Sequence, residues 1–168
     1  MPDDALDRFN AEPVDRAHEA LRSCNAAPSF ATTVAAGRPY PSADALVARV
    51  EAVSRALPWD EVAAALAAHP RIGHRMQGTS AEATASRSEQ SGMTTASDSV
   101  RAAMVEGNRA YEDRFGHVFL IRAAGRSPEE MLAELRRRLG TDEATERAEV
   151  TEQLAQITVL RVRALVAA

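Results

Sequence analysis

Residues 69–92 read HPRIGHRMQGTSAEATASRSEQSG, and the rest of the chain is organised around this stretch. Pro70 disfavours the α region for the residue before it, so a helix through residues 63–68 should end at His69. The imidazole would then lie at a helix C-terminus, where the helix dipole favours the protonated form. A histidine that titrates near neutrality is the commonest general acid–base, so His69 is the first candidate for catalysis.

A second helix should begin near Thr79, which forms a capping box with the glutamate three residues later. Ser86, Glu89 and Gln90 then share one helix face, at i, i+3 and i+4. The alanines around them bury little apolar area, so the face is polar, and a carboxylate on it could orient the His69 ring by accepting its N–H. The alternative is a helix stop followed by a solvated face, and these residues taken alone favour that alternative.

Composition limits the possible functions. The chain has 168 residues, which indicates one domain with a real core, and its net charge of −4 gives no reason to bind nucleic acid or an anionic membrane. No apolar run approaches membrane-spanning length, and the acidic N-terminus does not resemble a signal peptide. The single cysteine, Cys24, excludes an internal disulfide and fits a reducing cytoplasm.

The sequence contains no lysine, so all 20 basic residues are arginines. A lysine Schiff base, with substrate or with pyridoxal phosphate, is therefore impossible. His69 and His74 lack the spacing and the third ligand of a zinc site, and no glycine-rich phosphate loop is present. Ser88 and Cys24 have no visible base. We therefore expect neither a metal nor a cofactor.

Periodicity and caps predict an all-α fold, a single compact domain of roughly eight helices. A short extended apolar run over residues 117–123 should interrupt the helices. Apart from the segments above, helical patterns cover residues 3–10, 13–24, 26–37, 42–57 (capped by Ser42), 58–69, 95–116 (beginning with a Thr95-x-x-Asp98 box), 127–140 and 142–166.

Two single polar residues and one run of arginines in these helices call for a separate interpretation. Asn108 falls within an apolar stripe, where a buried amide that holds neighbouring main chain is the expected role. Arg161 also falls within a stripe, which implies either an anion opposite it or a structural role, by snorkelling or by pairing with a carboxylate. The residues alone leave these alternatives open. Residues 136–138, three consecutive arginines, read as a solvated face.

The motifs HPRIG (69–73), SRSEQSGM (86–93) and NRAYEDRFGHVFLI (108–121) together resemble the OHCU decarboxylase family, where OHCU is 2-oxo-4-hydroxy-4-carboxy-5-ureidoimidazoline. The resemblance extends from Phe9 to the final helix. The His-Pro and Ser-x-x-Glu-Gln motifs are specific in combination, although each is weak alone.

The resemblance implies cofactor-free decarboxylation of this ureidoimidazoline to (S)-allantoin and CO2 in urate degradation, by a homodimer. It implies catalytic roles for His69 and Glu89. It also implies that four side chains bind the substrate: Pro70, Ser86 and Gln90 of the polar face, and Arg161. The main chain of the extended run would bind it too, at Phe119, Leu120, Ile121, Arg122 and Ala123.

The sequence departs from the commoner family motif after His-Pro, where many members have an acidic residue and then Leu-Ala-Gly. This chain has Arg71-Ile72-Gly73, which leaves open how residues 71–78 close the site. The competing hypothesis is a non-catalytic helical interaction module with the same fold. The complete set of His69, the polar face and Arg161 favours the enzyme.

Overall fold

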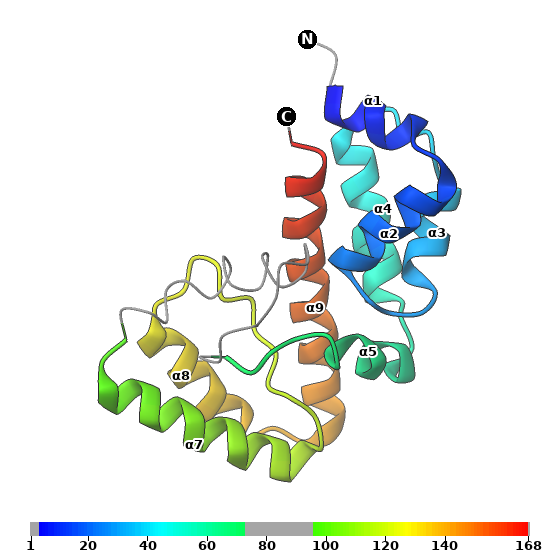
Figure 1. Cartoon of the computed structure of the whole chain (residues 1–168). Helices are drawn as coiled ribbons and strands as arrows, with labels where there is room; N and C mark the ends of the chain where they lie inside the picture. The colour runs from blue at the N-terminus through cyan, green and yellow to red at the C-terminus, as the bar shows by residue number, and fades with distance from the viewer. Residues whose placement is uncertain (1–3, 73–95, 168) are drawn as a thin grey trace. The chain divides into compact units, whose positions relative to one another are not determined.

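A computed structural model describes residues 4–72 and 96–167 of the chain (Figure 1). This part of the chain is helical, with no strand, as predicted. Its eight helices are α1 (Asp4–Ala11), α2 (Val14–Cys24), α3 (Phe30–Ala36), α4 (Ala43–Arg55), α5 (Trp59–Leu66), α7 (Asp98–Phe115), α8 (Pro128–Arg138) and α9 (Glu143–Leu165).

The chain divides into two compact units. The first comprises residues 1–65 and 154–168, and the second comprises residues 66–153. Helices α5 and α9 each contribute to both units. That residues 1–168 form one domain remains a prediction.

The first unit has an apolar core made mainly by α2, α3 and α4, in which α3 packs against both of the others. Leu21, Phe30, Val34 and Leu46 are fully buried in it. The predicted Ser42 cap of α4 is present, since its hydroxyl accepts the Ala45 N–H at 3.0 Å. The cap of α4 therefore forms as the sequence predicts, whereas α3 begins at Phe30, four residues later than its predicted start.

The second unit is built on α7 packed against α8. A Cβ atom at Gly107 of α7 would lie 2.6 Å from Leu135 Cδ2 of α8, so glycine allows the close approach of the two helices. Gly116 ends α7 in the left-handed region, at φ 79°, as predicted. The N-terminus of α7 differs from the expectation: the cap is Ser97, whose hydroxyl accepts the Val100 N–H at 3.3 Å.

The expectation of a solvated arginine face over residues 136–138 is wrong for Arg138. Its side chain is fully buried and pairs with the buried carboxylate of Glu146 in α9. The neighbouring Arg137 side chain is half exposed, as expected. Arg138 lies three residues after Leu135 and seven after Met131, which places it on the buried face of α8. Because the three arginines are consecutive, the sequence does not make it apparent that only Arg138 continues this buried stripe.

In the described ranges, 4–72 and 96–167, no helix combines the length and the apolar composition needed to cross a membrane.

Candidate functional site

His69 lies in a turn just beyond α5. The helix ends at Leu66, three residues earlier than predicted, and the His69 main-chain N–H donates to the Leu66 carbonyl at 3.0 Å. This i to i−3 hydrogen bond is the tighter turn common at helix ends. Both His69 and Pro70 are half-buried. His69 thus lies three residues beyond the end of α5 rather than on the helix.

The residues after Pro70 are held by two side chains of α7. Asn108 Nδ2 donates to the Ile72 carbonyl at 3.0 Å, and the Glu112 carboxylate accepts two hydrogen bonds from Arg71, at 2.6 and 2.9 Å. The hydrogen bonds to Glu112 raise the pKa of the Arg71 guanidinium. The role predicted for Asn108 is confirmed: it is 2% exposed and holds main chain 36 residues away in sequence. Two anchors therefore fix the chain where it leaves the His-Pro turn.

The run 119–123 lies between α7 and α8 and contains no helix (Figure 1). Four of its five residues are buried, and Arg122 is half-buried. The Leu120 carbonyl accepts from Arg138 Nη1 at 2.6 Å, and the Arg122 N–H donates to Gln153 Oε1 at 2.8 Å. Side chains of α8 and α9 thus hold the main chain of the run from one side.

The His-Pro turn and the extended run share one apolar core. Ile72, three residues after His69, belongs to the same cluster of buried side chains as Phe119, Ile121 and Ala123. The structure therefore brings together two of the segments that the sequence marked as candidate site.

Arg161 is 7% exposed and lies in α9, in the first unit. Its guanidinium donates to the Ser23 carbonyl at 3.4 Å. The predicted position in a buried stripe is confirmed, because Val150, Leu154 and Ile157 of the same helix are buried. Whether Arg161 binds an anion or serves the fold stays open. Three of the predicted site residues lie outside the described ranges: Ser86, Glu89 and Gln90.

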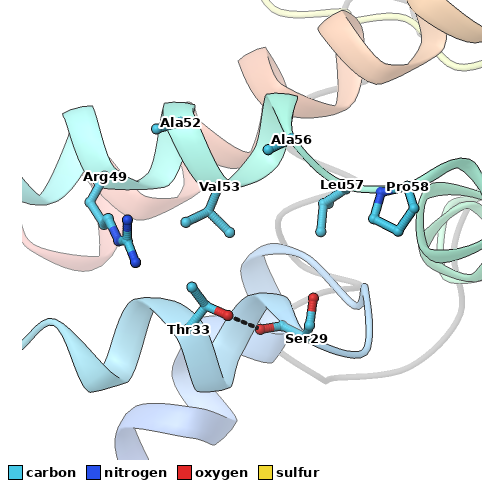
Figure 2. Close-up of a pocket in the computed structure, with 8 residues that line it drawn as sticks. All are labelled: Ser29, Thr33, Arg49, Ala52, Val53, Ala56, Leu57 and Pro58. Atoms are coloured by element: carbon cyan, nitrogen blue, oxygen red, sulfur yellow. Dashed lines mark hydrogen bonds between the residues drawn. The ribbon is translucent and has the colours of Figure 1, made fainter.

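A pocket of about 310 Å³ lies in the first unit, between α3 and the end of α4 (Figure 2). It is lined largely by small or apolar side chains, and it contains none of the predicted site residues. Thr33 donates to the Ser29 carbonyl on its wall at 2.8 Å. The full lining is Ser29, Thr33, Arg49, Ala52, Val53, Ala56, Leu57 and Pro58. No side chain in this set is suited to acid–base chemistry at neutral pH, so the pocket is not the candidate site.

Comparison with known proteins decides the family. A family model described as OHCU decarboxylase matches residues 10–163. The chain belongs to the OHCU decarboxylase family. Its match to that family includes the His-Pro turn, the extended run and most of α9.

Individual members support this assignment. This chain is 31% identical over 141 residues to the 2-oxo-4-hydroxy-4-carboxy-5-ureidoimidazoline decarboxylase of Amia calva. The alignment covers 83% of this chain and 81% of the relative. The chain also matches a crystal structure of OHCU decarboxylase in the presence of (S)-allantoin, with a TM-score of 0.71 and 28% identity over 86% of this chain and 94% of that one.

A crystal structure of (S)-allantoin synthase shares the fold, with a TM-score of 0.71 and 17% identity. This chain spans about half of that protein, since the match covers 95% of this chain and 53% of the synthase. At this identity the likeness concerns the fold alone.

The described residues contain no group of three histidine, cysteine, aspartate or glutamate side chains placed to hold a metal ion.

Proposed function

We infer that this protein is an OHCU decarboxylase, which converts 2-oxo-4-hydroxy-4-carboxy-5-ureidoimidazoline to (S)-allantoin and CO2 in urate degradation. The observation that carries this inference is the family match over residues 10–163, almost the whole chain. The related crystal structure obtained in the presence of (S)-allantoin supports a small, polar ligand of this chemical class.

The reaction can proceed without an added electron sink. When the bond to the carboxylate breaks, CO2 leaves and the electron pair enters the conjugated C=N of the substrate itself. A proton must then reach one face of the planar intermediate, and that face sets the (S) configuration. We assign this proton transfer to His69, whose ring type and half-buried position suit general acid–base catalysis.

We assign the remaining roles as the resemblance to the family implies. Glu89 would orient the His69 ring and accept from substrate N–H groups. Ser86, Gln90 and Arg161 would bind the ring, ureido and oxygen atoms, and Pro70 would pack against the ring. The main chain of residues 119–123 would supply further hydrogen bonds to the flat, polar heterocycle.

We also propose that the enzyme needs no metal or cofactor, is cytoplasmic and forms a homodimer. The absence of lysine supports the first point, because it removes Schiff-base chemistry. The single cysteine fits a reducing compartment. Light scattering at micromolar concentration should give twice the 18.1 kDa chain mass, and a monomer at every concentration tested would contradict the dimer.

The function is tested by mixing the purified protein with freshly generated substrate and following the decay of its ultraviolet absorbance. The protein should first be treated with a chelator and desalted. We expect decay far above the spontaneous rate, without added metal or cofactor. Decay at the spontaneous rate would contradict the function, and activity that returns only on adding a metal would contradict cofactor independence.

A further inference from the structure

Side chains of two helices hold main-chain groups of the run 119–123. In an extended chain, the main-chain groups of residues two apart point the same way, and those of the residue between them point the opposite way. The Leu120 carbonyl and the Arg122 N–H are two residues apart, and they bond to Arg138 of α8 and Gln153 of α9. The side of the run that bears these groups is therefore occupied by the protein.

Ile121 lies between these two anchored groups, and in an extended run its main chain faces away from them. Ile121 is 2% exposed, and no residue in the described part of the chain hydrogen-bonds to its N–H or its carbonyl. Buried main-chain groups are almost always paired with protein, water or ligand. The Ile121 main chain thus offers one donor and one acceptor on a single residue.

Contacts on several atoms fix the side chain of Arg138, which holds the Leu120 carbonyl. Its side chain is fully buried, Nε donates to Glu146 Oε1 at 2.8 Å, and its guanidinium lies 4.6 Å from the centre of the Phe119 ring. The Glu146 carboxylate is fixed in turn by the hydroxyls of Tyr111, at 2.5 Å, and Thr141, at 2.9 Å. A planar guanidinium with its donors engaged in different directions has little freedom, so the carbonyl it binds is also fixed.

We propose that Arg138 and Gln153 are positioning residues for the decarboxylation. By holding the Leu120 carbonyl and the Arg122 N–H, they fix the Ile121 main chain where it can hydrogen-bond to the polar substrate. Neither side chain touches the substrate. The proposal rests on the proposed function, and it predicts that substrate binding weakens when either main-chain group loses its anchor, even in variants that keep the buried charges balanced.

Gln153 gives the cleaner test, because methionine matches its size and lacks the acceptor. Gln153→Met should raise KM, and raise the dissociation constant of (S)-allantoin measured by calorimetry, each on the order of tenfold. Gln153→Glu keeps an oxygen acceptor at the same position and should restore most of the affinity. Arg138→Lys is the second variant. It keeps the charge beside Glu146, but one ammonium cannot reproduce the guanidinium fork, so affinity should fall here as well.

Tyr111→Phe is the matched control. It removes a hydrogen bond to Glu146 in the same buried network and keeps the aromatic ring against Phe119. It should lower Tm while leaving KM and the allantoin affinity within twofold of wild type. If Tyr111→Phe weakens binding as much as Gln153→Met does at a similar loss of Tm, the network only stabilises the fold and the proposal is overturned.

The two claims fail in different ways. Wild-type KM and allantoin affinity in both Gln153→Met and Arg138→Lys, with turnover intact, would overturn the positioning role and leave the function standing. A wild-type protein that binds (S)-allantoin without decarboxylating the ureidoimidazoline would overturn the function. In that case, weaker allantoin binding by Gln153→Met would still support the positioning role. Failure of the wild type to bind (S)-allantoin at all would overturn both.

Discussion

Arg138→Met should destabilise the protein strongly, although methionine fits a buried helix face. The substitution removes the donor to the Leu120 carbonyl and the cation paired with Glu146. The Glu146 carboxylate would stay fully buried, with only the hydroxyls of Tyr111 and Thr141 left to solvate it. Removing one partner of a buried ion pair costs about 3–5 kcal/mol.

For a chain of this length, each kcal/mol shifts Tm by about 2–4 °C, so Arg138→Met should lower Tm by about 6–20 °C. The adjacent arginine is the matched control. Arg137 also pairs with two carboxylates, those of Glu134 and Glu149, but its side chain is 50% exposed. Exposed pairs contribute about 0–1 kcal/mol each, so the two pairs of Arg137 together contribute at most about 2 kcal/mol, and Arg137→Met should lower Tm by less than about 8 °C.

Scanning calorimetry at neutral pH, with urea unfolding as a second measure, compares the two variants. Replacing both partners, as Arg138→Met with Glu146→Leu, should recover most of the lost stability, because no uncompensated charge then remains buried. Equal losses of Tm for the Arg137 and Arg138 variants would refute the reasoning, since burial would then not set the strength of the pair.

Three further predictions follow from other sites. Glu89→Gln should reduce kcat severely in the absorbance assay with little change in Tm, because the charge that orients His69 is lost, and near wild-type turnover would show that Glu89 is only a solvated helix residue. Asn108→Leu should cost about 1–3 kcal/mol in urea unfolding, because the buried Ile72 carbonyl loses its donor, and an unchanged unfolding midpoint would contradict the anchor. The Thr145 N–H holds the pKa of the Asp142 carboxyl below its usual range, so Asp142 should stabilise the fold above about pH 4 and lose that contribution as pH falls through its lowered pKa; the Tm difference between wild type and Asp142→Ala should therefore shrink in acid, and a difference that grows would contradict the cap.

Local signals predicted most of the fold. Ser42 and Ser127 cap α4 and α8, and Gly116 ends α7, because a helix terminus is set by the few residues beside it. The boundary before His69 was harder to place. Pro70 excludes a helix through His69, but it does not determine how many of the preceding residues form a tighter turn.

The buried ion pair was missed for a different reason. Whether an arginine is solvated or buried depends on its partner, and Glu146 lies eight residues away, on the next helix. The residues of the candidate site were predicted from the resemblance to the OHCU decarboxylase family. The structure added what spacing alone could not give, namely that Ile72 packs in one core with Phe119 and Ile121 and that Asn108 holds the Ile72 carbonyl.

The stereochemistry of the product tests the central claim most directly. Circular dichroism during turnover should show (S)-allantoin accumulating in excess over the racemate as the substrate absorbance decays. His69→Asn should lose about 10²–10⁴-fold in rate and give nearly racemic product, whereas His18→Asn, which changes a half-buried histidine of α2, should match wild type. Racemic product from the wild type, or full rate and stereochemical purity in His69→Asn, would contradict a decarboxylase that uses His69 to protonate one face of its intermediate.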